Sequence, residues 1–150
     1  MFLRKPPNQN KVEYVNLRNV SYINETPESI ILNMCFSYED KKSRIISHQH
    51  FLNADDKGFM ESKYFQDNFV KVVGDDRIVY ANRQFIASII AEMPVDPENN
   101  KIIICFTNGV TKDPNGRILP EYLYIRMSDG DVHKYVKELV KIIELKGLKD

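Results

Sequence analysis

An internal repeat constrains the fold of this chain more than any other feature of its sequence. Segment 16–23 reads Asn-Leu-Arg-Asn-Val-Ser-Tyr-Ile and segment 82–89 reads Asn-Arg-Gln-Phe-Ile-Ala-Ser-Ile, so Asn, Val or Ile, and Ile recur at matching positions. Each copy leads through a turn containing Glu and Pro to an apolar run, at 30–32 and at 102–104. The copies begin about 66 residues apart, which indicates one small module used twice. A duplicated module without a catalytic motif is typical of scaffolds and binding surfaces.

The hydrophobic pattern predicts a chain made mainly of β-strands. Alternating or continuous apolar runs bounded by turn residues predict strands at 11–17, 20–23, 29–38, 45–52, 70–73, 77–81, 101–107 and 121–127. Residues 131–146 carry a wide apolar stripe at helical spacing, which predicts an amphipathic C-terminal helix. The predicted fold class is α+β: mainly antiparallel β-sheet with this helix, and with two similar units if the repeat is structural.

The predicted domain organisation is a short arm followed by a compact domain. Residues 1–10 contain Pro and Asn and predict an extended, mobile arm. Residues 11–150 predict a single compact domain, which the repeat would divide into related units at 11–70 and 71–150. Apolar residues make up 43% of the chain, enough for a packed interior.

The segment 83–93 supports two conflicting predictions. Apolar residues at 85, 86, 89, 90 and 93 form a helical stripe, which Asn82 could cap and Pro94 would end. The repeat instead matches this segment with 20–23, which has the pattern of a strand. We favour the helix, because the stripe has five members and contains Ala87 and Ala91.

Charge and hydropathy argue against nucleic acid and membranes as the main partners of this chain. The chain carries 21 basic and 21 acidic residues, whereas a general nucleic-acid binder is expected to have a basic excess. A basic group near the start, formed by Arg4, Lys5, Lys11 and Arg18, leaves weak nucleic-acid binding as an alternative. No stretch approaches 18 apolar residues and no signal peptide is visible, which predicts a cytoplasmic protein without membrane partners.

The two cysteines lie within apolar runs, and no catalytic residue is predicted. Buried free thiols are the expected state of Cys35 and Cys105, with a disulfide between them as the alternative in an oxidising compartment. The chain has no Gly-x-Ser-x-Gly motif, no phosphate-binding loop and no recognisable Cys–His pair. An enzyme is therefore the less favoured interpretation.

The motif His48-Gln49-His50 is the candidate metal site. On a strand the two imidazoles share one face, because side chains alternate. A divalent metal could be held by His48 and His50 with Asp55, or with Asp56 or His133 in its place. The alternative is a solvated strand face and no cofactor.

Two surfaces are candidates for protein binding. The helical stripe widens to Ile142 and Leu145, which is more apolar surface than one core contact needs. Tyr122 and Tyr124 share one face of the last predicted strand. These patterns predict a non-enzymatic scaffold or protein-binding module that self-associates or binds a protein partner.

The repeated segments resemble small bacterial β-rich proteins of the FlbD type, which are associated with flagellar gene clusters. The resemblance rests on Ala81-Asn82, Ile86, Ile89, Pro94 and 102–104, and on Val15-Asn16, Val20, Ile23, Thr26-Pro27-Glu28 and 30–32. It covers about a third of the chain and implies no catalytic residues. The sheet ending in one helix is also similar to pleckstrin-like sheets, in topology alone.

Overall fold

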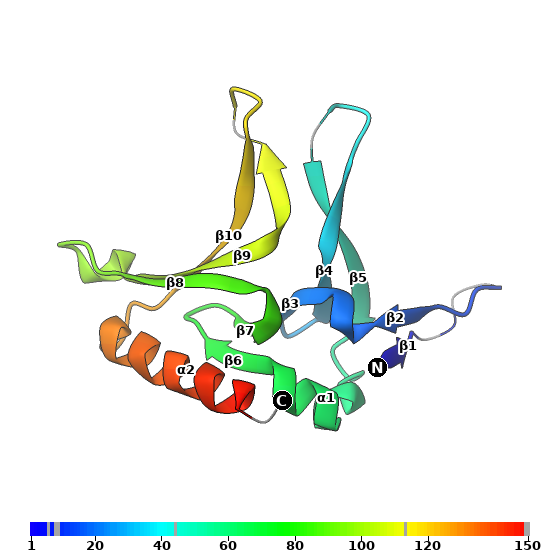
Figure 1. Cartoon of the computed structure of the whole chain (residues 1–150), viewed down its shortest axis with the longest axis horizontal. Coiled ribbons are helices and arrows are strands. Elements are labelled where there is room, and N and C mark those ends of the chain that lie inside the picture. The colour runs from blue at the N-terminus through cyan, green and yellow to red at the C-terminus, as the bar shows by residue number, and fades with distance from the viewer. Residues whose placement is uncertain (6, 8–9, 44, 113, 149–150) are drawn as a thin grey trace.

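The computed structural model describes residues 1–148 apart from 6, 8–9, 44 and 113 (Figure 1). Its strands are β1 (Phe2–Arg4), β2 (Tyr14–Asn16), β3 (Val20–Glu25), β4 (Ser29–Glu39), β5 (Ile45–Asn53), β6 (Phe69–Val73), β7 (Ile78–Asn82), β8 (Ile86–Glu92), β9 (Lys101–Lys112) and β10 (Ile118–Arg126). Its α-helices are α1 (Lys63–Asn68) and α2 (Val132–Gly147), and its 3₁₀ turns are η1 (Leu17–Asn19), η2 (Gly58–Glu61), η3 (Arg83–Phe85) and η4 (Pro97–Asn99). The fold is α+β, mainly antiparallel sheet with a C-terminal helix, as predicted.

The described strands form three sheets. One has the order β5-β4-β3-β7-β6, a second β10-β9-β8, and a third β1-β2, all with antiparallel neighbours. The hairpins β4–β5 and β9–β10 rise beside one another in Figure 1, while α2 runs along the opposite side of the molecule. The first sheet thus takes strands from both halves of the chain.

The repeat is visible in the backbone, where the same corner between two strands occurs once in each half. Asn16 ends β2 and Asn82 ends β7, and the side-chain oxygen of each accepts a hydrogen bond of 3.1 Å from the backbone N–H two residues later. A three-residue 3₁₀ turn follows in both places, and then the next strand begins. Asn is suited to this corner because its short side chain reaches the nearby backbone.

The sheet register repeats as well. In each half, the strand after the corner slips by one residue against the strand that follows it, which is the signature of a β-bulge. The partners on either side of the slip are Val20–Met34 and Tyr22–Asn33 in the first half, and Ile86–Phe106 and Ser88–Cys105 in the second. The two halves therefore share element order, corner and bulge: β1 to α1 corresponds to β6 to α2.

The favoured prediction of a helix over 83–93 is wrong. Residues 83–85 form η3 and residues 86–92 form strand β8, as the repeat indicated. Within the predicted arm over 1–10, Phe2–Arg4 are extended and form β1, which pairs with β2. Residues 6 and 8–9 of that arm lie outside the described residues.

Two hydrophobic clusters fill the interior, one for each half. The first is centred on Leu17, Val20, Ile23, Ile30 and Leu32. The second, which α2 covers, is centred on Val72, Val79, Ile102, Ile104 and Ile125. Burying such a side chain contributes roughly 1.5–3 kcal/mol to stability. The sheet containing β3 and β7 separates the clusters and contributes residues to both.

Candidate functional site

The histidine pair predicted from the sequence is formed on β5. The rings of His48 and His50 lie 4.9 Å apart in an edge-on arrangement. Phe36 on β4 stacks on His48, with ring centroids 5.1 Å apart. The alternation of side chains along the strand therefore brings the two imidazoles together, as expected.

The surroundings of His50 are electrostatically mixed. Its Nδ1 lies 3.4 Å from Lys5 Nζ and 3.6 Å from Glu13 Oε1, and Lys5 and Glu13 form an ion pair of 3.2 Å. Burial lowers the pKa of His50, because the charged imidazolium loses hydration. The hydrogen bond from Lys5 lowers the pKa of Glu13. The ammonium group beside His50 opposes the approach of a cation.

The predicted third metal ligand is not brought to the pair. Asp55 lies in the turn after β5, and both Asp55 and His133 are exposed, the latter on α2. Within the described part of the chain, no three His, Cys, Asp or Glu side chains are placed to hold a metal ion. The metal site remains a prediction that rests on two histidines.

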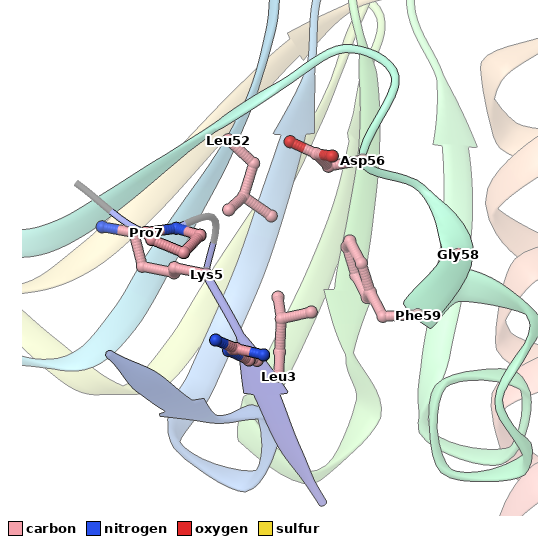
Figure 2. Close-up of a pocket in the computed structure, with 8 residues that line it drawn as sticks. Leu3, Lys5, Pro7, Leu52, Asp56, Gly58 and Phe59 are labelled. Atoms are coloured by element: carbon pink, nitrogen blue, oxygen red, sulfur yellow. The ribbon is translucent and has the colours of Figure 1, made fainter. Parts of the chain in front are cut away.

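A cavity of about 370 Å³ opens between β1 and the turn after β5 (Figure 2). Leu3, Leu52 and Phe59 supply its apolar wall, and its charged residues are Arg4, Lys5 and Asp56. Asp56 Oδ2 is buried without a hydrogen-bond partner among the described residues. The sequence analysis missed this cavity because its walls come from segments about 50 residues apart and no motif joins them.

The tyrosine face predicted for protein binding is exposed. Tyr122 and Tyr124 on β10 keep 42% and 55% of their surface. Each stands in a row across the second sheet, Tyr122 beside Cys105 and Tyr124 beside Ile103. Ile90 on β8, opposite Ile103, continues the second row and is also exposed. The exposed side chains of this face therefore come from the two edge strands β8 and β10, while Ile103 and Cys105 of the central strand β9 are buried.

The C-terminal helix is only partly covered. Val132, Val136 and Leu139 are buried against the second core, whereas Ile142 and Leu145 are exposed by 47% and 62%. The buried residues anchor the helix, and the exposed pair lies in its C-terminal half. The pair lies on α2 and the tyrosines lie on β10, so the two candidate surfaces belong to different elements.

Both cysteines are free thiols in the structure. Cys105 is buried in β9, and Cys35 is partly buried in β4. Burial raises the pKa of Cys35, because the thiolate is poorly solvated there. The alternative of a disulfide between these residues is not seen.

Comparison of the chain with known proteins supplies no relative. No protein family, curated protein or solved structure matches it. The resemblance to FlbD-type proteins thus remains a prediction. None of the described helices has the length and apolar character needed to cross a membrane.

Proposed function

We propose that this protein is a non-enzymatic scaffold or protein-binding module that self-associates in the cytoplasm. The observation that carries the proposal is the exposure of apolar side chains on regular structure: Tyr122 and Tyr124 on β10, and Ile142 and Leu145 on α2. Rigid elements hold these side chains in place, so that little conformational freedom is lost on binding. Tyrosine suits such a surface because its ring packs while its hydroxyl group hydrogen bonds.

The exposed half of α2 provides the first test. Replacing both Ile142 and Leu145 with Glu should reduce self-association by tenfold or more, because the charged groups would be buried in the interface. Sedimentation velocity measures the association, and circular dichroism checks that the monomer folds. The matched control is Lys141→Glu, which changes the net charge by the same amount on the same helix.

Each outcome of this test has a defined meaning. Loss of assembly in the double variant alone supports the helix surface. Global unfolding would place the pair in the core and contradict the proposal for α2. An unchanged association would remove α2 from the interface and leave the tyrosine face, which Tyr122→Ser with Tyr124→Ser probes in the same way.

Binding of a divalent metal is a second candidate function, supported by the contact between His48 and His50. Metal analysis of the purified protein beside a His48→Ala/His50→Ala variant tests it. Near-stoichiometric metal that disappears in the variant supports the site. Equal, trace metal in both proteins contradicts it.

A further inference from the structure

We propose that the protein assembles head to tail, with β8 of one copy pairing with β2 of the neighbouring copy. The proposal rests on the proposed self-association and names the surfaces that carry it. The template is the contact between the two halves inside one chain, where β3 pairs with β7. Because β8 corresponds to β3 and β2 corresponds to β7, the same pairing is available between chains.

The sheet orders support this correspondence. The complete sheet has the order β5-β4-β3-β7-β6. Through the repeat, the smaller sheet β10-β9-β8 corresponds to its part β5-β4-β3, and the smaller sheet β1-β2 corresponds to its part β6-β7. Joining β8 to β2 of a neighbour gives β10-β9-β8-β2-β1, which reproduces the complete sheet strand for strand. Each copy thus carries one incomplete sheet at each of two surfaces.

The internal pairing also defines the register between chains. Inside the chain, Tyr22, Ile23, Asn24 and Glu25 stand opposite Ala81, Tyr80, Val79 and Ile78. Transferred through the repeat, the pairs between chains are Ser88–Val15, Ile89–Tyr14, Ile90–Glu13 and Ala91–Val12. One step further along, Lys11 meets Glu92, so the register also brings opposite charges together.

Burial shows that β8 lacks the partner that β3 has. Val20 and Ile23 are fully buried in β3, whereas their counterparts Ile86 and Ile89 are only partly buried. Tyr22 is buried as well, and its counterpart Ser88 is exposed. Among the described strands, β8 pairs with β9 alone, and its other edge has no strand beside it.

The opposite surface shows the same difference. Phe69 in β6 is 4% exposed, stacked on Phe65 of α1 at 4.9 Å, whereas its counterpart Phe2 in β1 is 64% exposed. Tyr80 in β7 is partly buried, and its counterpart Tyr14 in β2 is 59% exposed. In the assembly, α2 of the neighbouring copy packs beside Phe2 in the way that α1 packs beside Phe69 within the chain. The exposed apolar residues of α2 then have a partner.

A side-chain hydrogen bond marks the internal joint and predicts its counterpart between chains. Asn82 Nδ2 donates to the backbone carbonyl of Val20 across the joint, at 3.0 Å. Within the described residues, the side chain of Asn16 makes only one hydrogen bond, in which its oxygen accepts from the backbone N–H of Arg18. In the proposed assembly, Asn16 Nδ2 donates to the carbonyl of Ile86 in the neighbouring copy.

An isosteric substitution isolates this bond. Asn16→Asp keeps the oxygen that accepts from Arg18 and loses the donor, placing a carboxylate against a carbonyl oxygen. We expect self-association to weaken roughly tenfold or more while the monomer unfolds at an unchanged urea concentration. The matched control is Asn19→Asp, an exposed residue at the same corner, which should assemble like the wild type.

A second variant blocks the other surface. Ile90→Glu places a carboxylate opposite Glu13 of the neighbouring copy, and we expect it to be monomeric. Val73→Glu is its control, because Val73 has similar exposure, 47%, on the edge strand β6. Adding Glu13→Lys to Ile90→Glu should restore association, because the opposed charges then attract.

Mixing the two variants tests the head-to-tail geometry. The Asn16→Asp copy retains an intact β8 surface, and the Ile90→Glu copy retains an intact β2 surface. At a concentration between the dissociation constants of the wild type and the Asn16→Asp variant, an equimolar mixture should therefore form dimers and nothing larger, while each variant alone stays monomeric. Sedimentation velocity and light scattering give the masses.

The outcomes separate this proposal from the proposed function. A wild type that stays monomeric at high micromolar concentration overturns the assembly, and binding of other proteins through α2 or the tyrosine face would survive. Assembly that resists both Asn16→Asp and Ile90→Glu but is lost in the Ile142→Glu/Leu145→Glu variant overturns the strand pairing and retains self-association. A mixture without dimers overturns the head-to-tail geometry.

Discussion

At the scale of single residues, the two corner asparagines have the same backbone role and different tertiary roles. Asn82 is fully buried and bonds across the joint between the halves, whereas Asn16 is partly exposed. We expect Asn16→Ala to cost about 0.5–2 kcal/mol, the usual cost of a lost side-chain cap. Asn82→Ala should cost about 1–3 kcal/mol more, because the Val20 carbonyl loses its partner in a buried site.

Urea denaturation of both alanine variants measures this difference directly. Equal costs for the two substitutions would contradict the assignment of a joint-spanning role to Asn82.

The lowered pKa of Glu25 leads to a prediction of how the stability of the fold depends on pH. The hydrogen bond from Lys57 lowers its pKa, and Tyr80 donates a further bond of 2.8 Å. Because the folded pKa lies below the unfolded value, the unfolded chain binds more protons in this range, and stability falls as pH falls. The contribution of Glu25 is present above about pH 4.5 and is lost as pH drops through the lowered pKa.

Glu25→Gln should therefore flatten the dependence of the unfolding free energy on pH below about 4.5. Urea denaturation of the wild type and the Glu25→Gln variant, at a series of pH values from neutral downward, measures this dependence. Parallel curves would show that Glu25 titrates alike in the folded and unfolded states. Burial, together with the hydrogen bond to Glu25, raises the pKa of Tyr80 to about 12.

At the scale of elements, β8 explains why the sequence favoured a helix. The bulge adds one residue between Ile86 and Ser88, so the core-facing residues are Ile86, Ile89 and Ala91. Their first spacing is three rather than two, which imitates a helical period. The hydrophobic periodicity alone could not distinguish a helix from a strand in this segment. The repeat could, because Val20 and Ile23 have the same spacing in β3.

Other elements were predicted where local pattern and tertiary structure agree. The apolar stripe predicted helix α2, and the strand pattern predicted the hairpin β6–β7. The cavity, the joint and the exposed edge of β8 depend on contacts between distant segments, which no local pattern records. Of the candidate site, the sequence predicted the side-by-side histidines and the exposed Tyr122 face, but not the surroundings of His50.

The close packing of the β6–β7 hairpin on β10 gives a prediction at this scale. A Cβ added to Gly74 would meet Ile125 Cγ2 at 2.5 Å and the Arg126 carbonyl oxygen at 3.1 Å. Ile125 is fully buried and cannot move aside freely. Gly74→Ala should therefore destabilise the fold by about 1–3 kcal/mol, the usual cost of overpacking.

Urea denaturation tests this prediction, with Gly58→Ala as the control, because a Cβ at Gly58 has nothing within 4 Å. Equal stability of the Gly74→Ala variant and the wild type would show that the hairpin can move away from β10.

At the scale of the whole molecule, the shared sheet predicts a single unfolding transition. Leu32 lies in the first core and Ile104 in the second, both fully buried, and β3 and β7 form a wall common to the two cores. Leu32→Ala and Ile104→Ala should each cost about 2–5 kcal/mol. Each should lower the same transition temperature, by about 2–4 °C per kcal/mol for a chain of this size.

Differential scanning calorimetry checks this, with the calorimetric enthalpy compared to the van't Hoff enthalpy. Two transitions, each sensitive to only one of the substitutions, would show that the halves unfold independently.

The position of Tyr22 gives the molecule a built-in optical reporter. Tyr22 belongs to the first half, yet its ring stacks on Phe106 of β9 at 5.2 Å and its hydroxyl group donates to Glu121. The chain has no tryptophan, so tyrosines dominate its near-ultraviolet absorption. Tyr14, Tyr122 and Tyr124 are exposed and contribute little chiral signal, whereas Tyr22 is held rigidly. Tyr64, Tyr80 and Tyr135 are partly buried and also contribute, so the part of the near-ultraviolet circular dichroism that Tyr22→Phe removes should follow the docking of one half onto the other.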